Sequence, residues 1–171
     1  TIKNINLRRK TGYKPRKKKY NDINGFHSME FRQGRMYEDF EYAMKFKYSE
    51  DEVTEMDTVK GSRTTGKCLL TLLFRSCSFM IIILLPNCTQ KAVINAINSL
   101  SNTLGIRTFK KYFPVILTDN GSEFKNPWDI EKTENGTHRT YVFYCDPYVS
   151  NQKARLEKNH EYIRYVIPKG R

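Results

Sequence analysis

The sequence predicts an α/β fold in which helices pack on a mixed five-stranded sheet. Three apolar segments come first, and the connections between them are too short for parallel pairing, so we expect an antiparallel meander. A segment with helical spacing then leads from the third strand to a fourth, and this crossover allows a mixed sheet covered by helices. A fifth apolar segment and a last amphipathic helix complete the predicted order.

The meander begins with residues 53–59 (VTEMDTV). One face of this strand carries alternating residues: Val53, Glu55, Asp57 and Val59. A turn at residues 60–66 leads to two long apolar strands, residues 68–74 and 78–86, which the short segment RSC connects. The turn nearly matches a phosphate-binding P-loop. Its final position is a cysteine that begins a strand, however, whereas a P-loop needs a hydroxyl at the start of a helix, so a hairpin turn is favoured.

A helix follows the meander, with Thr89 as its predicted N-cap and Gly105 at its end. Its apolar face recurs at helical spacing: Val93, Ile97, Leu100 and Leu104. Residues 114–119 (PVILTD) predict the fourth strand. The polar residues 125–139, which include an Asn-Gly pair, predict a loop, and residues 140–146 (TYVFYCD) predict the fifth strand.

Two further helices flank these segments. Residues 34–46 (GRMYEDFEYAMKF) carry a helical apolar stripe: Met36, Phe40, Ala43, Met44 and Phe46. In the last helix, Ser150 or Asn151 is the expected cap, and Pro168 and Gly170 end the helix. Its expected buried stripe has four members: Leu156, His160, Ile163 and Ile167.

We divide the chain into a basic arm or linker (residues 1–33), a linker helix (residues 34–52) and a folded core (residues 53–171). The first 20 residues hold nine Lys or Arg and no acidic residue, with KPRKKKY as the densest part. Such a segment is typical of a flexible arm that contacts a polyanion, and equally of a tail without a specific role.

The charge of the chain favours a nucleic-acid partner. The 30 Lys and Arg residues exceed the 18 Asp and Glu residues, for a formal net charge of +12. An excess of this size in one domain suggests a polyanion, although a merely soluble basic surface has the same composition.

The cysteines and the apolar segments exclude several other classes of protein. The four cysteines form no C-x-x-C pair and lie at no finger spacing from a histidine, which argues against structural zinc. We expect Cys68, Cys77 and Cys88 to be small core residues in a reducing compartment. The longest apolar run, residues 79–85, is too short to span a bilayer, and the first residues lack a signal-peptide core, so we expect a cytosolic protein.

Four carboxylates are candidates for a site. Asp57 lies inside a strand, and Asp119 ends the fourth strand before an Asn-Gly pair that favours a turn. Glu157 and Glu161 lie one turn apart on the last helix. If the first and fourth strands are neighbours, the two aspartates share a pocket to which the helix can bring one glutamate. Taken singly, each acid is equally well explained as a surface or capping group.

Convergence of three carboxylates would predict metal chemistry. Like charges repel at short range and need cations, and hard oxygen ligands suit Mg²⁺ or Mn²⁺. Two such ions can clamp a scissile phosphate between the attacking and the leaving oxygen. Together with the basic charge, this predicts an enzyme that acts on nucleic acid.

Several stretches, in order along residues 34–171, resemble the catalytic core of DDE transposases, and most closely the insertion sequence thirty family. They are GRMYEDF, EMDTVKG, FPVILTDNGSEF, VFYCDPY and EKNHEYIRYVIPKG. The resemblance implies a ribonuclease H-like fold, shared with retroviral integrases. It also implies a C-terminally truncated core, because the sequence stops before the helices that usually follow.

The resemblance assigns Asp57, Asp119 and Glu157 as the catalytic, metal-binding triad, and so selects Glu157 over Glu161. It implies Mg²⁺, with Mn²⁺ as a substitute and two ions expected, and it assigns Asn120 and Gly121 to the turn that holds Asp119. The usual glycine of the Q-K-G motif before the glutamate is replaced by alanine in this chain.

The implied activity is cleavage of a phosphodiester at an element end, followed by transfer of the freed 3′ end into target DNA. The implied partners are double-stranded DNA and further copies of the chain, in the bacterial cytoplasm at the nucleoid. Expected DNA contacts are Lys17, Lys18 and Lys19 in the arm, and Arg164 and Lys169 near the end. Two alternatives remain: another ribonuclease H-like nuclease, or a catalytically decayed, DNA-binding remnant of a transposase.

Overall fold

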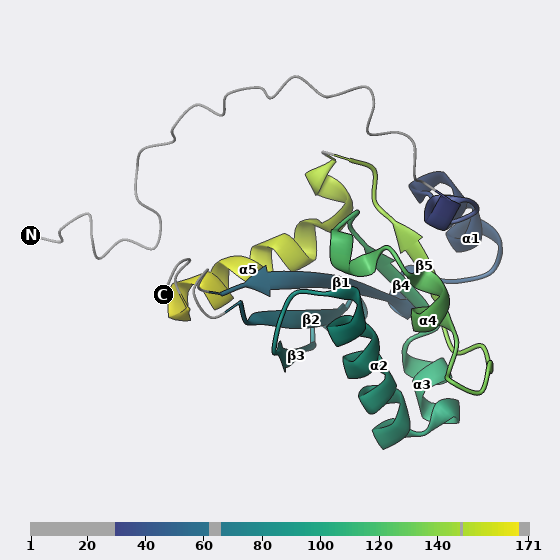
Figure 1. The fold of residues 1–171 in the computed structure, drawn as a ribbon. Helices are drawn as coiled ribbons and strands as arrows, with labels where there is room; N and C mark the ends of the chain where they lie inside the picture. The colour runs from purple at the N-terminus through teal and green to yellow at the C-terminus, as the bar shows by residue number, and fades with distance from the viewer. Residues whose placement is uncertain (1–29, 62–65, 148, 168–171) are drawn as a thin grey trace, which may run out of the picture.

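A computed structural model describes residues 30–61, 66–147 and 149–167 (Figure 1). Five strands form one mixed sheet in the order β3-β2-β1-β4-β5. Their bounds are β1 (Val53–Lys60), β2 (Cys68–Phe74), β3 (Met80–Leu85), β4 (Val115–Thr118) and β5 (Tyr141–Tyr144). The first three strands pair antiparallel, and β4 is parallel to both β1 and β5, which confirms the predicted meander and the mixed sheet.

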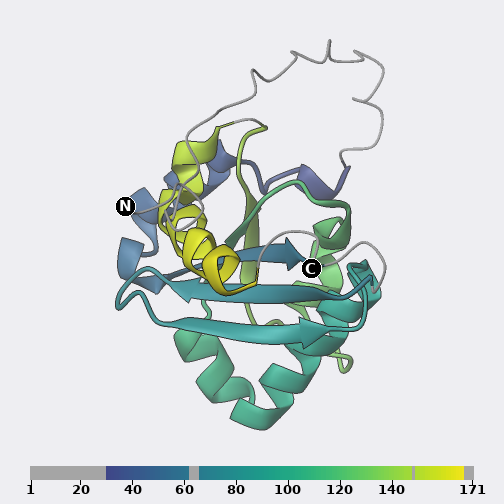
Figure 2. The same cartoon turned by 90° about the vertical axis from the view of Figure 1, so that its left-hand side faces the viewer.

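Helices cover both faces of this sheet. Their bounds are α1 (Tyr37–Phe46), α2 (Gln90–Leu104), α3 (Ile106–Tyr112), α4 (Pro127–Glu131) and α5 (Ala154–Val166). Figures 1 and 2 show α2 and α3 on one face, with α5 lying across the strands on the other. Four short 3-10 turns complete the elements: Glu30–Arg32, Glu50–Glu52, Ser122–Phe124 and Ser150–Lys153.

Alternation along the strands divides the core into two clusters, one on each face of the sheet. Met56 of β1 and Ile116 of β4 join the larger cluster, which α2 and α3 cover. Val53 of β1 and Val115 of β4 point the other way, into a smaller cluster that α1 closes with Phe40. Residues 53, 55 and 57 therefore share the face on which α1 and α5 pack.

The predicted limits of α2 are confirmed. The side chain of Thr89 accepts a hydrogen bond from the backbone of Ala92, and Gly105 has a φ of 77°, in the region that favours glycine. Two further helices were not predicted. Residues 106–112 form α3, which is too short for a clear periodic signal, and α4 lies inside residues 125–139, which we had expected to be a loop.

Several predicted burials are wrong. Met36 and Phe46 at the ends of α1 are 44% and 64% exposed, because the sheet covers only the middle of this helix, where Phe40 is buried. Ile167 is 41% exposed and lies beyond the end of α5. Cys77 is exposed in the turn between β2 and β3, whereas Cys68 is buried as expected.

The predicted cap of the last helix is also wrong. Lys153, rather than Ser150 or Asn151, occupies the N-cap of α5, because a 3-10 turn precedes the helix. Residues 62–65 of the predicted hairpin turn, and Pro168 and Gly170 at the predicted helix end, lie outside the described residues. Cys68 begins a strand, which agrees with a hairpin and not with a P-loop.

The N-terminal part of the described chain packs against the core. Phe31 is buried and makes an edge-on contact with Tyr144, with ring centroids 5.1 Å apart. The greater part of the predicted basic arm, residues 1–29, lies outside the described residues. None of the helices in the described part is both long and apolar enough to span a membrane.

Candidate active site

The parallel pairing of β1 and β4 brings Asp57 and Asp119 side by side. Glu55 pairs with Leu117, a register offset of 117 − 55 = 62 residues. The two aspartates have the same offset, 119 − 57 = 62, so the register continued by two residues sets them opposite each other. Both also lie on the sheet face that α5 covers, because they follow Glu55 and Leu117 at a spacing of two.

A tight turn holds Asp119 at the end of β4. The backbone N–H of Gly121 donates to Asp119 Oδ1 at 2.9 Å, and Asn120 Nδ2 donates to the carbonyl oxygen of Cys145 at 2.8 Å. A Cβ on Gly121 would lie 3.0 Å from Asp119 Oδ1 and 2.9 Å from Glu123 Oε2. Glycine therefore lets two carboxylates approach the same turn, as the resemblance had implied for Asn120 and Gly121.

The electrostatics of Asp119 indicate a carboxylate pair that lacks positive charge. Burial raises the pKa of Asp119, the charge of Lys153 lowers it, and the charge of Asp57 raises it again; the net pKa lies above its ordinary value. A cation between the two carboxylates would favour the ionised form of both.

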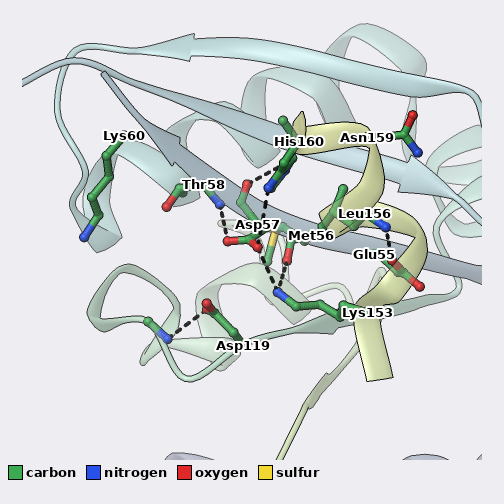
Figure 3. A network of polar contacts seen from close by, with 12 residues as sticks. Glu55, Met56, Asp57, Thr58, Lys60, Asp119, Lys153, Leu156, Asn159 and His160 are labelled. Atoms are coloured by element: carbon green, nitrogen blue, oxygen red, sulfur yellow. Dashed lines mark hydrogen bonds and ion pairs between the residues drawn. The ribbon is translucent and has the colours of Figure 1, made fainter. Parts of the chain in front are cut away.

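The segment at the start of α5 places a cationic group against Asp57. Lys153 Nζ lies 3.2 Å from Asp57 Oδ2 and 3.4 Å from the carbonyl oxygen of Met56 (Figure 3). The other carboxylate oxygen of Asp57 accepts the backbone N–H of Thr58 at 2.6 Å. The lysine is 6% exposed, so its ammonium is withdrawn from solvent and stabilised by these acceptors.

His160 approaches Asp57 from the next turns of α5. Its Nδ1 lies 3.9 Å from Asp57 Oδ2, and its Nε2 lies 2.8 Å from Thr71 Oγ1. The hydroxyl of Thr71 donates its only proton to the carbonyl oxygen of Asp57, so His160 Nε2–H must donate to Thr71. Burial lowers the pKa of His160, and the imidazole is therefore neutral at pH 7.

A buried ion pair fixes α5 over the aspartates. Glu55, which is 1% exposed, accepts a hydrogen bond from Arg75 Nε at 2.7 Å and another from the backbone N–H of Leu156 at 3.0 Å. Arg75 Nη2 also donates to the carbonyl oxygen of Gln152 at 3.0 Å. The backbone on both sides of Lys153 is thereby attached to β1 and to the end of β2.

A pocket of about 330 Å³ opens beside the two aspartates. We call it the carboxylate pocket, and its lining residues are Asp57, Thr58, Lys60, Asp119, Gly121, Ser122, Glu123 and Arg164. Arg164 reaches it from α5, where Nη2 donates to the carbonyl oxygen of Lys60 at 2.7 Å. The pocket therefore has carboxylates on one side and two cationic residues on another.

Glu123 adds a third carboxylate to the pocket wall. Its Oε1 accepts hydrogen bonds from Thr58 Oγ1 at 2.5 Å and from Cys88 Sγ at 3.2 Å. Burial works to raise the pKa of Glu123, but these hydrogen bonds hold it below its ordinary value. The side chain is therefore ionised at neutral pH.

The structure brings only part of the predicted site together. Asp57 and Asp119 converge, and Arg164 lines the pocket beside them. The backbone of Glu157 is part of α5, but its side chain lies outside the described residues, as do Lys17, Lys18, Lys19 and Lys169. The alternative glutamate, Glu161, is exposed.

Sequence reasoning missed Lys153, His160, Glu55 and Glu123 as parts of this site. A usable signal existed for His160, which lies one helical turn after Glu157, and for Glu123, which lies four residues after Asp119. Nothing in the sequence marked Lys153 or Glu55, because their partners are distant along the chain: Lys153 contacts Asp57, 96 residues away.

The aspartate pair suits a hard divalent cation. Its donors are carboxylate oxygens, which Mg²⁺ and Mn²⁺ prefer, and the mutual repulsion evident at Asp119 is what a cation would relieve. Among the side chains that the structure describes, no three His, Cys, Asp or Glu residues form a ready ligand group. Any third protein ligand would have to be a side chain such as that of Glu157.

Comparison with known proteins adds no relative. The chain matches no family model, and no curated protein shows significant similarity to it.

Proposed function

We propose that this chain is the catalytic core of a DDE transposase with a ribonuclease H-like fold, similar to the insertion sequence thirty family. In this proposal it cleaves a phosphodiester at the ends of an insertion sequence and transfers the freed 3′ end into target DNA. The observation that carries the proposal is the side-by-side position of Asp57 and Asp119 on neighbouring parallel strands, where they open into a pocket edged by cationic residues.

The proposed roles follow from this geometry. Asp57 and Asp119 would hold the divalent cation, which, when bound, polarises the phosphate and favours both the attacking and the leaving oxygen. Helical spacing places position 157 on the side of α5 shared with residues 153 and 160, both of which contact Asp57, so Glu157 is the proposed third ligand. No covalent intermediate with the protein is required.

The surrounding charge supports a DNA substrate. Lys60 and Arg164 line the carboxylate pocket, where they can bind phosphates on either side of the scissile bond. The net charge of +12 supplies attraction that does not depend on sequence. This attraction would bring duplex DNA to the pocket without reading its bases.

A plasmid assay tests the proposal. We would incubate the chain with supercoiled plasmid and Mn²⁺ or Mg²⁺ and score nicked circles on a gel. The expected result is metal-dependent nicking that Asp57→Asn and Asp119→Asn abolish. The matched control is Asp129→Asn, the same chemical change at an exposed carboxylate of α4 outside the pocket. Equal nicking by the parent and both pocket variants would refute the proposed active site.

A second assay separates a transposase from other ribonuclease H-like nucleases. The chain would be mixed with a labelled duplex that carries a free 3′-OH and with unlabelled plasmid. Joining of the label to the plasmid is expected of a transposase, and cleavage without joining of a nuclease. DNA binding without either reaction would instead favour the decayed remnant.

A further inference from the structure

We propose that Lys153 is a built-in counter-ion of the Asp57–Asp119 pair, whose ammonium stabilises the metal-free site and weakens the binding of a divalent cation. This inference rests on the proposed metal site. It concerns the residue that a divalent cation meets when it binds there.

The position of the ammonium supports this role. Lys153 Nζ lies 3.2 Å from Asp57 Oδ2, at the buried base of the aspartate pair and outside the residues that line the carboxylate pocket. The pocket side of the pair is therefore open to a cation while the lysine stays in place. Figure 3 shows Lys153 extending from the start of α5 toward Asp57, with Asp119 close by.

The charge of Lys153 acts on both carboxylates. It forms the ion pair with Asp57, and it also lowers the pKa of Asp119 against burial and the charge of Asp57. Two carboxylates in a partly buried site are costly without positive charge, and the lysine supplies one unit of it. A divalent cation that binds to the same carboxylates must do so within range of this ammonium, which repels it.

The backbone around Lys153 is held as such a role requires. Arg75 binds the carbonyl oxygen of Gln152, and Glu55 binds the backbone N–H of Leu156, one residue before and three residues after the lysine. The lysine is the N-cap residue of α5, yet its side chain makes no capping hydrogen bond. Its side chain is directed to the aspartates instead.

The test is a comparison of Mn²⁺ binding by three variants and the parent, by calorimetric titration and by melting curves in chelator and in Mn²⁺. Lys153→Met removes the charge, and Lys153→Arg keeps it. The matched control is Lys158→Met, the same change at an exposed lysine of α5. These readouts require no catalytic activity.

For a counter-ion, we expect Lys153→Met to melt at a lower temperature than the parent in chelator, but to bind Mn²⁺ at least tenfold more tightly. Its Mn²⁺-induced rise in Tm should exceed that of the parent. Lys153→Arg and Lys158→Met should bind Mn²⁺ with the parent's affinity.

Two outcomes would overturn the inference in different ways. If the parent binds Mn²⁺ and Lys153→Met binds it equally or more weakly, the lysine only positions Asp57, and the proposed metal site stands without the counter-ion. If the parent shows no Mn²⁺ binding at all, the metal site itself fails, and the inference fails with it.

A variant that does not fold in chelator still decides the question. If Lys153→Met is unfolded without metal, addition of Mn²⁺ should refold it, because the cation takes over the role of the ammonium. A failure to refold at Mn²⁺ concentrations that saturate the parent would count against the counter-ion role.

Discussion

Replacement of Asp119 by Asn tests the metal site with little change of shape. The side-chain oxygen of Asn can still accept the backbone N–H of Gly121, which binds Asp119 Oδ1 at 2.9 Å, so the turn should persist. What disappears is one negative charge beside Asp57. We therefore expect the variant to fold, to keep its affinity for DNA and to lose cleavage.

The size of the metal effect follows from binding linkage. At a Mn²⁺ concentration 100 times its Kd, binding stabilises the parent by about 2.7 kcal/mol. For a chain of this size, that corresponds to a rise in Tm of about 5–11 °C. Loss of a residue that only supports a ligand weakens metal binding about 10–100-fold, and loss of a direct ligand should cost at least as much. At a 100-fold weaker affinity, about 0.4 kcal/mol remains, or a rise of about 1–2 °C.

The metal-free comparison has a defined dependence on pH. Because the pKa of Asp119 in the folded chain lies above its ordinary value of 3.8, the folded state holds this proton more tightly than the unfolded state does. The resulting destabilisation of the parent is absent below pH 3.8, grows as the pH rises through the folded pKa, and is complete above it. In chelator at neutral pH, Asp119→Asn should therefore be as stable as the parent or slightly more stable.

The assay is a set of melting curves for the parent, Asp119→Asn and the control Asp129→Asn, each in chelator and in Mn²⁺. The parent and the control should show the full metal-induced rise in Tm, and Asp119→Asn a small fraction of it. An equal rise in all three proteins would refute the assignment of Asp119 as a metal ligand. Asp119 would then be an ordinary turn residue.

Three further changes probe other parts of the molecule. Glu55→Gln leaves Arg75 buried without its charged partner and should lower the free energy of unfolding, measured in urea, by about 3–5 kcal/mol; an exposed-pair value of 1 kcal/mol or less would contradict the anchoring role. Gly121→Ala sets a Cβ 3.0 Å from Asp119 Oδ1, and we expect at least tenfold weaker Mn²⁺ binding by calorimetry with the fold retained; unchanged affinity would mean that the turn has room for a side chain. Deletion of residues 1–20, which remove nine positive charges, should flatten the salt dependence of DNA affinity by several units, at about 0.9 in log K per phosphate contact, and leave nicking intact; an unchanged slope would show that the arm does not touch DNA.

Much of the sheet could be predicted from local patterns alone. The apolar alternation and the turn signals identified all five strands, and connection length alone determined that the first three are antiparallel. Thr89 and Gly105 marked the limits of α2 because caps depend on neighbouring backbone groups. The short helices α3 and α4 escaped prediction, because seven and five residues are too few to show a helical period.

The sequence also determined which aspartates were worth attention, but not that they meet. Asp57 was unusual as a charge inside a strand, and Asp119 as an acid at a strand end, and each could have been a separate surface group. The parallel pairing of β1 with β4 decided between these possibilities, because its offset of 62 residues equals the separation of the two aspartates. Pairing between distant strands depends on the whole core, and no local pattern encodes it.

The tertiary structure alone revealed the charges that surround the pair. Lys153 is an unremarkable lysine in the sequence, yet it is buried against Asp57, and Glu123 is a polar turn residue that becomes an ionised wall of the pocket. Electrostatic roles of this kind depend on distance and burial, and both are properties of the folded chain rather than of residue type. Residues 53–60 and 150–160 lie about 100 positions apart in the sequence, and only the packing of α5 on β1, held by Glu55 and Arg75, makes them one site.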